Sequence, residues 1–209
     1  MSSAVWTDSV PGWTTYGPEQ SGNVSEIYSY LTSHGVSQTA AYAIIGNMQQ
    51  ESYLNPGQWE LGSNYDPSAG FGLGQWTPST KVSNITGTGR LQMMNIQNQL
   101  DILLNDPGQW STRYVDTNNW STYYNTNVPY FATFNDFLTD TTYPLDMMTK
   151  AYMACWERPS AQYANIQGRI NYASHWAGTP PGPGPTPVIT PAILIAILAK
   201  KAQLWRMKL

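Results

Sequence analysis

The sequence predicts a mainly helical domain with a small β-hairpin or loop insertion, followed by a linker and a tail. Apolar residues recur at helical spacing on both sides of residues 58–78, a stretch that holds six glycines and prolines. The stretch GTPPGPGPTP, residues 178–187, then separates this body from residues 188–209. A length of 209 residues with 41% hydrophobic content suits one domain with a core and an appendage.

The first half of the chain predicts an extended arm and two helices. Residues 1–23 are rich in Gly, Pro, Ser and Thr and are expected to form the arm. A helix is expected at about 24–34, with Gly35 as its stop. A second helix is expected over 37–52, because a serine suits its N-cap and an Asn-Pro-Gly turn follows it. The glycine-rich insertion comes next.

The second half predicts further helices, so that the folded domain spans residues 24–177. One covers about 89–105, and residues 136–138 belong to a short one. Pro144 suits the first position of another, and a last helix covers 160–176. The inward faces of the last two helices are expected to be Leu145, Met148, Tyr152 and Cys155, and Tyr163, Ile166, Ile170 and Ala173.

The tail is predicted to form a short apolar and basic helix over 188–209. Residues 192–199 are all apolar, and four of the chain's ten basic residues follow them. Eight helical residues cover about 12 Å, which is short of a bilayer core. An exposed apolar surface of this kind favours association. We therefore expect the tail to bind a partner protein, with an anionic membrane surface as the alternative.

Composition limits the classes of function. Only 11% of the residues are charged, against about 25% in typical soluble domains, whereas there are nine Trp and fourteen Tyr. This mixture suits the recognition of neutral polar ligands such as sugars, although a low-charge secreted or virion surface would look the same. The first 199 residues carry a charge of −7, which argues against nucleic acid as a partner. The N-terminus has no signal-peptide pattern, so delivery by a route other than ordinary secretion is expected.

The stretch AIIGNMQQESYLNPG, residues 43–57, places an acid on an apolar helical face. Ile44, Met48 and Glu51 fall at i, i+4 and i+7, which is one stripe of a helix. Burial disfavours the charged form of a carboxyl group, so an acid held there can keep a proton and donate it to a leaving oxygen, as glycoside cleavage requires. The alternative is a structural glutamate paired with an arginine. The candidate arginines are Arg90, Arg158 and Arg169.

The stretch SAGFGLGQWTP, residues 68–78, supplies residue types that suit a sugar cleft. Gly74 lets the backbone approach a ligand, Gln75 offers a donor and an acceptor, and Trp76 offers a flat apolar face. Glycine-rich loops with Gln and Trp also occur in ordinary turns. The pattern therefore favours a binding site without establishing one.

Three motifs resemble the phage tail lysozyme family and the wider group of lysozymes and lytic transglycosylases. GNMQQESYLNPG contains the pair Glu51-Ser52 at the expected end of a helix, and GFGLGQWT contains a Gly-Leu-Gly-Gln turn at 72–75. ACWERP, at 154–159, resembles a Trp-Glu-Arg-Pro element near the end of such domains. The motifs occur in the family's order, and the resemblance covers about residues 24–177.

The resemblance implies a lysozyme-like α+β fold, mainly α with a small β-hairpin lobe. It implies cleavage of bacterial peptidoglycan between N-acetylmuramic acid and N-acetylglucosamine. Glu51 matches the family's general acid, and Gln75 matches the amide that lines the cleft opposite it. Tyr152 is expected in the cleft wall or, equally, in the core. Glu157 is expected to be structural, paired with Arg158 or with a backbone amide.

The second carboxylate is less well defined by the sequence. A hydrolase usually needs one to activate water or to stabilise positive charge on the sugar. The candidates are Glu60 and Asp66, and Asp66 is preferred because it lies in the glycine-rich insertion, although Asp-Pro also suits a turn cap. If neither reaches the cleft, the sugar's acetamido group or its 6-hydroxyl serves. The 6-hydroxyl would make the protein a lytic transglycosylase.

No metal or cofactor is expected. His34 and His175 lie far apart in the sequence and lack ligand spacing with Cys155. Cys155 also lies on an apolar helical stripe, where a buried thiol is commonly inert.

Together the features predict a muramidase or lytic transglycosylase in a phage tail, acting outside the host cell on its wall. Glycan strands are its expected substrate, and other tail proteins are expected to bind the C-terminal helix. An endolysin and an inactive virion protein that binds the wall are the alternatives.

Overall fold

The structure is a computed structural model of the chain, and it describes residues 16–60, 66–87, 89–115, 124 and 126–178. The expected linker beyond Gly178 and the expected tail helix at 188–209 lie outside the described residues. In the described part, no helix is both long enough and apolar enough to cross a membrane.

The described chain is mainly helical, as predicted. Its α-helices are α1 (Pro18–Ser33), α2 (Gln38–Ser52), α3 (Thr80–Thr86), α4 (Arg90–Met93), α5 (Ile96–Asn105), α7 (Phe134–Thr139), α8 (Leu145–Tyr152) and α9 (Ile166–Gly178). A π-helical turn, Met153–Glu157, continues α8, and short 3₁₀ turns form at Pro107–Gln109 and Ala161–Tyr163.

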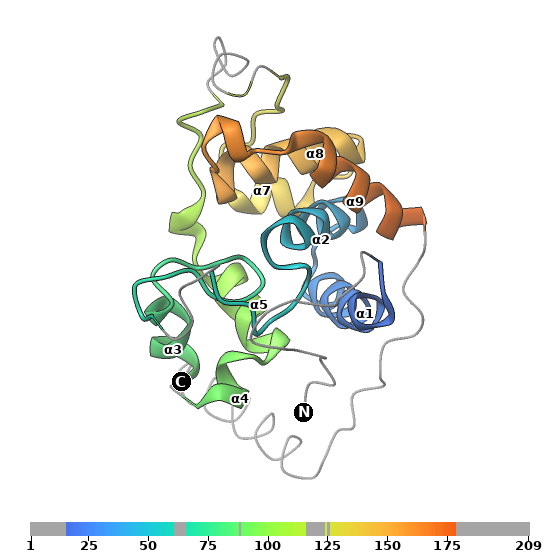
Figure 1. Ribbon diagram of the computed structural model, residues 1–209. Helices are drawn as coiled ribbons and strands as arrows, with labels where there is room; N and C mark the ends of the chain where they lie inside the picture. Colours follow the sequence, from blue (N-terminus) through green and yellow to red (C-terminus); the bar gives the residue numbers. More distant parts are fainter. Residues whose placement is uncertain (1–15, 61–65, 88, 116–123, 125, 179–209) are drawn as a thin grey trace, which may run out of the picture.

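Helix α2 forms the centre of the domain. It packs against α1, α7, α8 and α9, and Figure 1 shows α7 and α8 above it and α3, α4 and α5 below it. Every residue from 40 to 49 is buried, as expected for a helix surrounded by protein. Ser37 caps the helix by accepting a hydrogen bond from Ala40 N at 3.2 Å. The prediction for this helix is therefore confirmed, including both ends.

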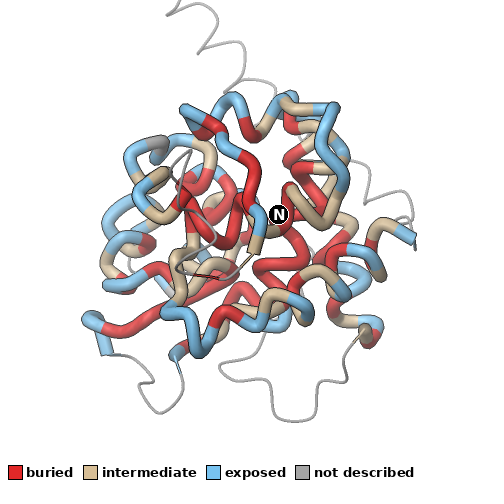
Figure 2. Tube along the Cα trace, turned by 90° about the horizontal axis from the view of Figure 1, so that it is seen from above, coloured by how far each residue is buried: buried red, intermediate tan, exposed pale blue. Residues whose placement is uncertain are grey.

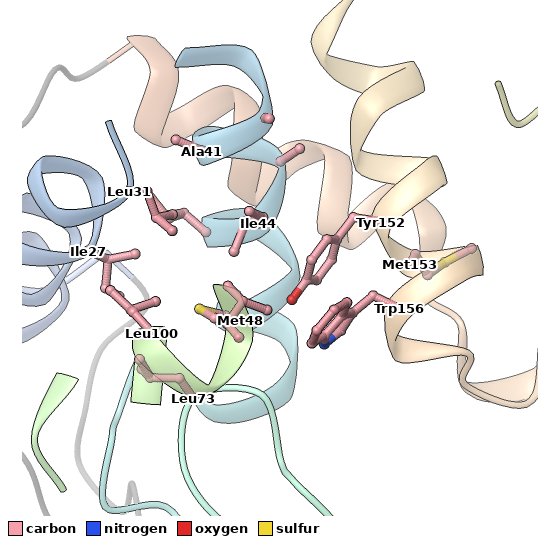
Figure 3. Close-up of a cluster of buried hydrophobic side chains, with 14 of the residues drawn as sticks. Ile27, Leu31, Ala41, Ile44, Met48, Leu73, Leu100, Tyr152, Met153 and Trp156 are labelled. Atoms are coloured by element: carbon pink, nitrogen blue, oxygen red, sulfur yellow. The ribbon is translucent and has the colours of Figure 1, made fainter. Parts of the chain in front are cut away.

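The core is continuous across α2. Met48 lies at its middle in Figure 3, with side chains from the other elements on both sides. These are Ile27 and Leu31 of α1, Leu100 of α5, Leu73 of the insertion, and Tyr152 and Trp156 at the end of α8. Figure 2 shows buried residues gathered inside a shell of exposed ones. The same core thus connects α2 to the insertion and to the α8 segment.

Several helix boundaries differ from the prediction, each for a local reason. Helix α1 begins at Pro18 and not near residue 24, so the predicted arm is too long. Its first turns are held because Gln20 and Asn23 are buried and Asn23 Nδ2 donates to Leu54 O at 2.9 Å. The predicted helix over 89–105 is divided into α4 and α5, because the side chain of Asn95 caps α5.

The last helix also begins later than predicted. Asn165 adopts a left-handed conformation with φ 41°, so α9 starts at Ile166. Tyr163 consequently lies outside the helix and is 71% exposed, which makes its predicted inward orientation wrong. Helix α3 was not predicted. The short helix α7 and the helix that follows Pro144 are confirmed.

The insertion between α2 and α3 is irregular. In its described residues, the strand-like contacts are two isolated antiparallel bridges, Trp59 with Phe71 and Phe71 with Trp76. The β-hairpin lobe is therefore not confirmed as regular strands. Closely spaced glycines leave few side chains to form a pleated surface, which accounts for the short pairing.

Candidate active site

Glu51 lies at the C-terminal end of α2, where the chain leaves the core. Tyr53 and Leu54 follow in left-handed conformations, with φ 55° and 60°, and turn the chain into the insertion. The side chain of Glu51 is 21% exposed, whereas Ile44 and Met48 on the same stripe are fully buried. The acid therefore stands at the boundary between the core and the solvent, as the helical pattern predicts.

Arg169 of α9 binds Glu51 from the core side. Its Nη2 lies 2.5 Å from Glu51 Oε1, its Nη1 donates to Asn47 Oδ1 at 2.9 Å, and its Nε donates to Ala164 O at 2.8 Å. The Arg169 side chain is only 2% exposed, so this ion pair is poorly screened by water. Among the three candidate arginines, Arg169 is thus the one that pairs with Glu51.

The turn at 72–75 is fastened to the end of α2 and to α5. Ser52 Oγ donates to Leu73 O at 3.0 Å, and Leu73 N donates to Gln99 Oε1 at 2.8 Å. Gly72 has φ 79°, and a Cβ there would lie 2.5 Å from Gln99 Oε1, so only glycine fits this approach. Ser52 therefore holds the glycine-rich turn beside Glu51, which explains why a Glu-Ser pair is followed by this turn.

A cleft opens beside Glu51, between the end of α2 and the insertion. Its volume is about 600 Å³, within the range of small-molecule sites. Its lining residues are Glu51, Tyr53, Gln58, Trp59, Glu60, Gly70, Gln75 and Thr77. Acids, amides, a hydroxyl and aromatic rings thus meet in one concavity, which is chemistry suited to a neutral polyhydroxy ligand.

Gln75 and Glu60 are both held by the insertion's own backbone. Gln75 Nε2 donates to Gln58 O and to Gly72 O, each at 3.1 Å. Glu60 Oε2 accepts from Gly70 N at 2.9 Å. These bonds fix the two side chains against the cleft wall, so a ligand would meet preformed groups. The structure therefore brings Gln75 together with Glu51, and brings Glu60 there as well.

Asp66 does not line this cleft. Its Oδ1 accepts from Ser68 N at 2.8 Å and from Ser68 Oγ at 2.7 Å, and these bonds lower the pKa of the exposed Asp66 carboxyl. This is the turn-capping arrangement that the sequence left open as the alternative. The geometry gives no support to the preferred catalytic role of Asp66.

Trp76 and Tyr152 belong to the core, and neither is among the residues that line the cleft. Trp76 and Trp59 are equally buried, at 7% exposed, and they differ in that Trp59 lines the cleft; a Cβ at Gly74 would meet the Trp76 ring at 3.4 Å. Tyr152 is fully buried and stacks on Trp156, with ring centroids 5.9 Å apart. The expected position of Tyr152 in the cleft wall is therefore replaced by the alternative, a position in the core. Gly74 and Trp76 shape the turn behind Gln75.

Sequence reasoning did not single out five of the residues that line the cleft, namely Tyr53, Gln58, Trp59, Gly70 and Thr77. Trp59 and Gln58 lie in the same glycine-rich stretch, but the alternation of small and aromatic residues did not distinguish Trp59 from Trp76. The sequence offered Arg169 only as one of three candidate partners of Glu51, because the two residues are 118 positions apart and no local pattern shows that they lie side by side. In the described residues, no cluster of His, Cys, Asp and Glu could hold a metal ion.

A mainly helical domain with an acid at the end of its central helix, facing a cleft of amides and aromatic rings, defines a lysozyme-like protein. The chain belongs to the phage tail lysozyme family, whose family model matches residues 22–179. Membership supports glycosidase-type activity in general terms.

A relative among phage proteins agrees with this assignment. The chain is 33% identical over 169 residues to morphogenesis protein 1 of Bacillus phage B103. The match covers 80% of this chain but 42% of that protein, so the chain spans about two fifths of the length of this relative. The family and this relative support a phage-associated protein.

Proposed function

We propose that the protein cleaves the β-1,4 glycan strand of bacterial peptidoglycan, with Glu51 as the general acid. The position of Glu51 supports this proposal. The residue binds the buried Arg169 on one side and lines an open cleft on the other, together with Gln75, Gln58 and Trp59. A proton on Glu51 would pass to the glycosidic oxygen as the bond between the sugars breaks. The amides and the ring would orient the sugar units.

Glu60 takes the place of Asp66 as the proposed second carboxylate. It lines the same cleft as Glu51, and its Oε2 is already oriented by Gly70 N. From there a carboxylate can stabilise positive charge on the sugar or activate water. If Glu60 has this role, the product is a reducing sugar and the enzyme is a muramidase.

The test uses purified peptidoglycan and mass analysis of the released fragments. Hydrolysis adds one water molecule to each cleaved bond, whereas a lytic transglycosylase leaves an anhydro end that is lighter by that water. Reducing ends that disappear in Glu60→Gln while anhydro ends stay absent would support the muramidase. Anhydro ends from the unmodified protein would reject the role of Glu60, and no fragments at all would reject the glycosidase.

The biological setting proposed is a phage tail protein that opens the host wall during infection. The family assignment supports this, and the name of the Bacillus phage B103 relative associates that protein with morphogenesis. The sequence of residues 188–209 remains the proposed docking segment for other tail proteins. Deleting it should leave wall cleavage intact and prevent incorporation into particles. Normal incorporation combined with loss of binding to anionic vesicles would favour the membrane alternative.

An inactive virion protein that binds the wall is the second candidate. The ion pair with Arg169 supports this candidate, because it engages Glu51 Oε1 in the way that a purely structural glutamate would be engaged.

A further inference from the structure

Tyr53 presents the more open of two aromatic rings at the cleft. Among the described residues that line the cleft, Tyr53 and Trp59 carry such rings. Tyr53 is 39% exposed, whereas Trp59 is 7% exposed and packs against Phe71, with ring centroids 4.7 Å apart. A ligand that enters the cleft would therefore meet more of the ring of Tyr53 than of the ring of Trp59.

The protein itself makes little use of the Tyr53 side chain. The backbone N–H of Tyr53 donates to Gln49 O at 3.0 Å. Within the part of the chain that the structure describes, its ring stacks on no other ring and its hydroxyl has no hydrogen-bond partner. Tyr143, by comparison, is 40% exposed, but its ring packs edge-on against Phe131, with centroids 5.5 Å apart. The Tyr53 ring is therefore available to a ligand.

The backbone conformation at Tyr53 does not suit a tyrosine. The residue follows α2 directly and is left-handed, with φ 55° and ψ 27°. Glycine is usual at such a position, because this conformation brings a Cβ close to a carbonyl oxygen. Leu54 is also left-handed, but its side chain is fully buried, so the core accounts for it. The core does not account for Tyr53 in this way, and unfavourable backbone conformations of this kind cluster at ligand-binding sites.

The lining residues of the cleft come from two parts of the chain. Glu51 and Tyr53 come from the end of α2, and the other described lining residues, among them Gln58 and Gln75, come from the insertion. Tyr53 lies two residues from Glu51. A sugar unit bound beside Glu51 would therefore have the ring of Tyr53 next to it and the amides of the insertion across the cleft.

This arrangement suits the two kinds of surface that a sugar presents. A β-1,4-linked sugar of the gluco configuration holds its hydroxyl and acetamido groups at the edge of the ring, so its two faces expose mainly C–H groups. Such an apolar face packs on the electron-rich face of an aromatic ring. The edge groups are left to form hydrogen bonds with amides and carboxylates.

We propose that Tyr53 is a substrate-binding residue whose ring stacks on one face of a sugar unit held beside Glu51. The proposal rests on the proposed function, because the ligand is the glycan strand that Glu51 would cleave. The ring supplies the contact, and the hydroxyl is not needed for it. Because the stacked sugar is held before and during bond cleavage alike, loss of the ring should affect KM more than kcat.

The test measures kcat and KM on soluble glycan strands of peptidoglycan for the unmodified protein, Tyr53→Gly and Tyr53→Phe. Glycine removes the ring and suits the left-handed backbone, so circular dichroism should show a folded domain. KM should rise by about five- to tenfold in Tyr53→Gly, as for loss of an aromatic anchor, and kcat should fall by less than about threefold. Tyr53→Phe keeps the ring and should recover most of the lost affinity. An unchanged KM in Tyr53→Gly, or an equal loss in both variants, would overturn the proposal.

Tyr143→Gly provides a matched control, because Tyr143 is as exposed as Tyr53 and is not among the residues that line the cleft. Its KM should equal that of the unmodified protein. A rise in KM as large as that of Tyr53→Gly would show that the loss of any exposed ring has this effect, and would contradict stacking at Tyr53.

Calorimetry separates binding from cleavage. The soluble strands are titrated into Glu51→Gln and into the double variant that also carries Tyr53→Gly. The second substitution should weaken Kd by about five- to tenfold, the same factor as for KM. An equal Kd for the two proteins would overturn the stacking role of Tyr53 and leave the role of Glu51 intact. Full cleavage activity in Glu51→Gln would instead reject the proposed function.

Discussion

Replacing Gly46 with alanine tests the helix contact that brings Arg169 to Glu51. Gly46 lies in α2, and a Cβ there would lie 2.6 Å from the Cβ of Ala173 in α9 and 2.7 Å from its backbone nitrogen. Non-bonded carbon atoms pack at about 3.5–4.0 Å, so α9 would have to move away by about 1 Å. Backbone atoms cannot rotate away as a flexible side chain can.

The magnitude follows from two opposing terms. Overpacking of this kind costs about 1–3 kcal/mol, whereas alanine in a helix is favoured over glycine by about 1 kcal/mol. Because the clash is with backbone, we expect Gly46→Ala to reduce the free energy of unfolding by about 1–2 kcal/mol. For a domain of this size, that corresponds to a fall in Tm of about 2–8 °C, measurable by thermal unfolding followed by circular dichroism.

Gly22 supplies the matched control. It also lies within a helix, α1, but a Cβ at this position would meet nothing within 4 Å. Gly22→Ala should therefore raise the free energy of unfolding by up to about 1 kcal/mol. If Gly46→Ala is as stable as Gly22→Ala, the close approach of α2 and α9 is wrong, and with it the placement of Arg169 beside Glu51.

Three further predictions concern the insertion and the buried acid Glu157. Gln99→Leu should lower the free energy of unfolding by about 1–3 kcal/mol in urea titrations, because Leu73 N, Pro56 O and Met93 O lose their partner. Gln162→Leu, at an exposed position, should change it by less than about 0.5 kcal/mol. Trp59→Ala should reduce the rate of glycan cleavage by more than its loss of folded protein explains, whereas Trp76→Ala should lower Tm and leave the folded fraction active. The reverse pattern would indicate that Trp76, and not Trp59, contacts the glycan. Burial in the folded state raises the pKa of Glu157, so the stability gained from its protonation is fully present below pH 4.5 and is lost as the pH rises toward the raised value. Glu157→Gln has no such loss and should therefore gain stability relative to the unmodified protein above pH 4.5. A difference in Tm that stays constant across pH would contradict this.

The helical framework was largely predictable because its signals are local. Ser37 and the apolar positions that follow it define α2 from its cap to its end, and Pro144 marks the start of α8. Where the prediction failed, a longer-range contact decided the outcome. Asn23 stabilises the early start of α1 through Leu54, which lies 31 residues further along the chain. No local pattern contains that information.

The site was predictable in its chemistry more than in its geometry. The helical stripe identified Glu51, and the glycine-rich turn identified Gln75. The choice between Glu60 and Asp66 depends on which way the loop directs each side chain. Alternation in sequence does not determine that in a segment whose described residues form only isolated bridges. A π-helical turn covers Met153–Glu157, so the spacing of an ordinary α-helix does not give the direction of the Glu157 side chain.

The most direct measurement is the rate of wall cleavage by Glu51→Gln beside the unmodified protein, on purified peptidoglycan at the pH optimum. The amide preserves the shape of the acid but cannot supply a proton, so the rate should fall by at least about 10²-fold, the lower end for loss of a general acid. Circular dichroism should show the same fold for both proteins. Near-full activity in a correctly folded Glu51→Gln would contradict the role of Glu51 as the general acid.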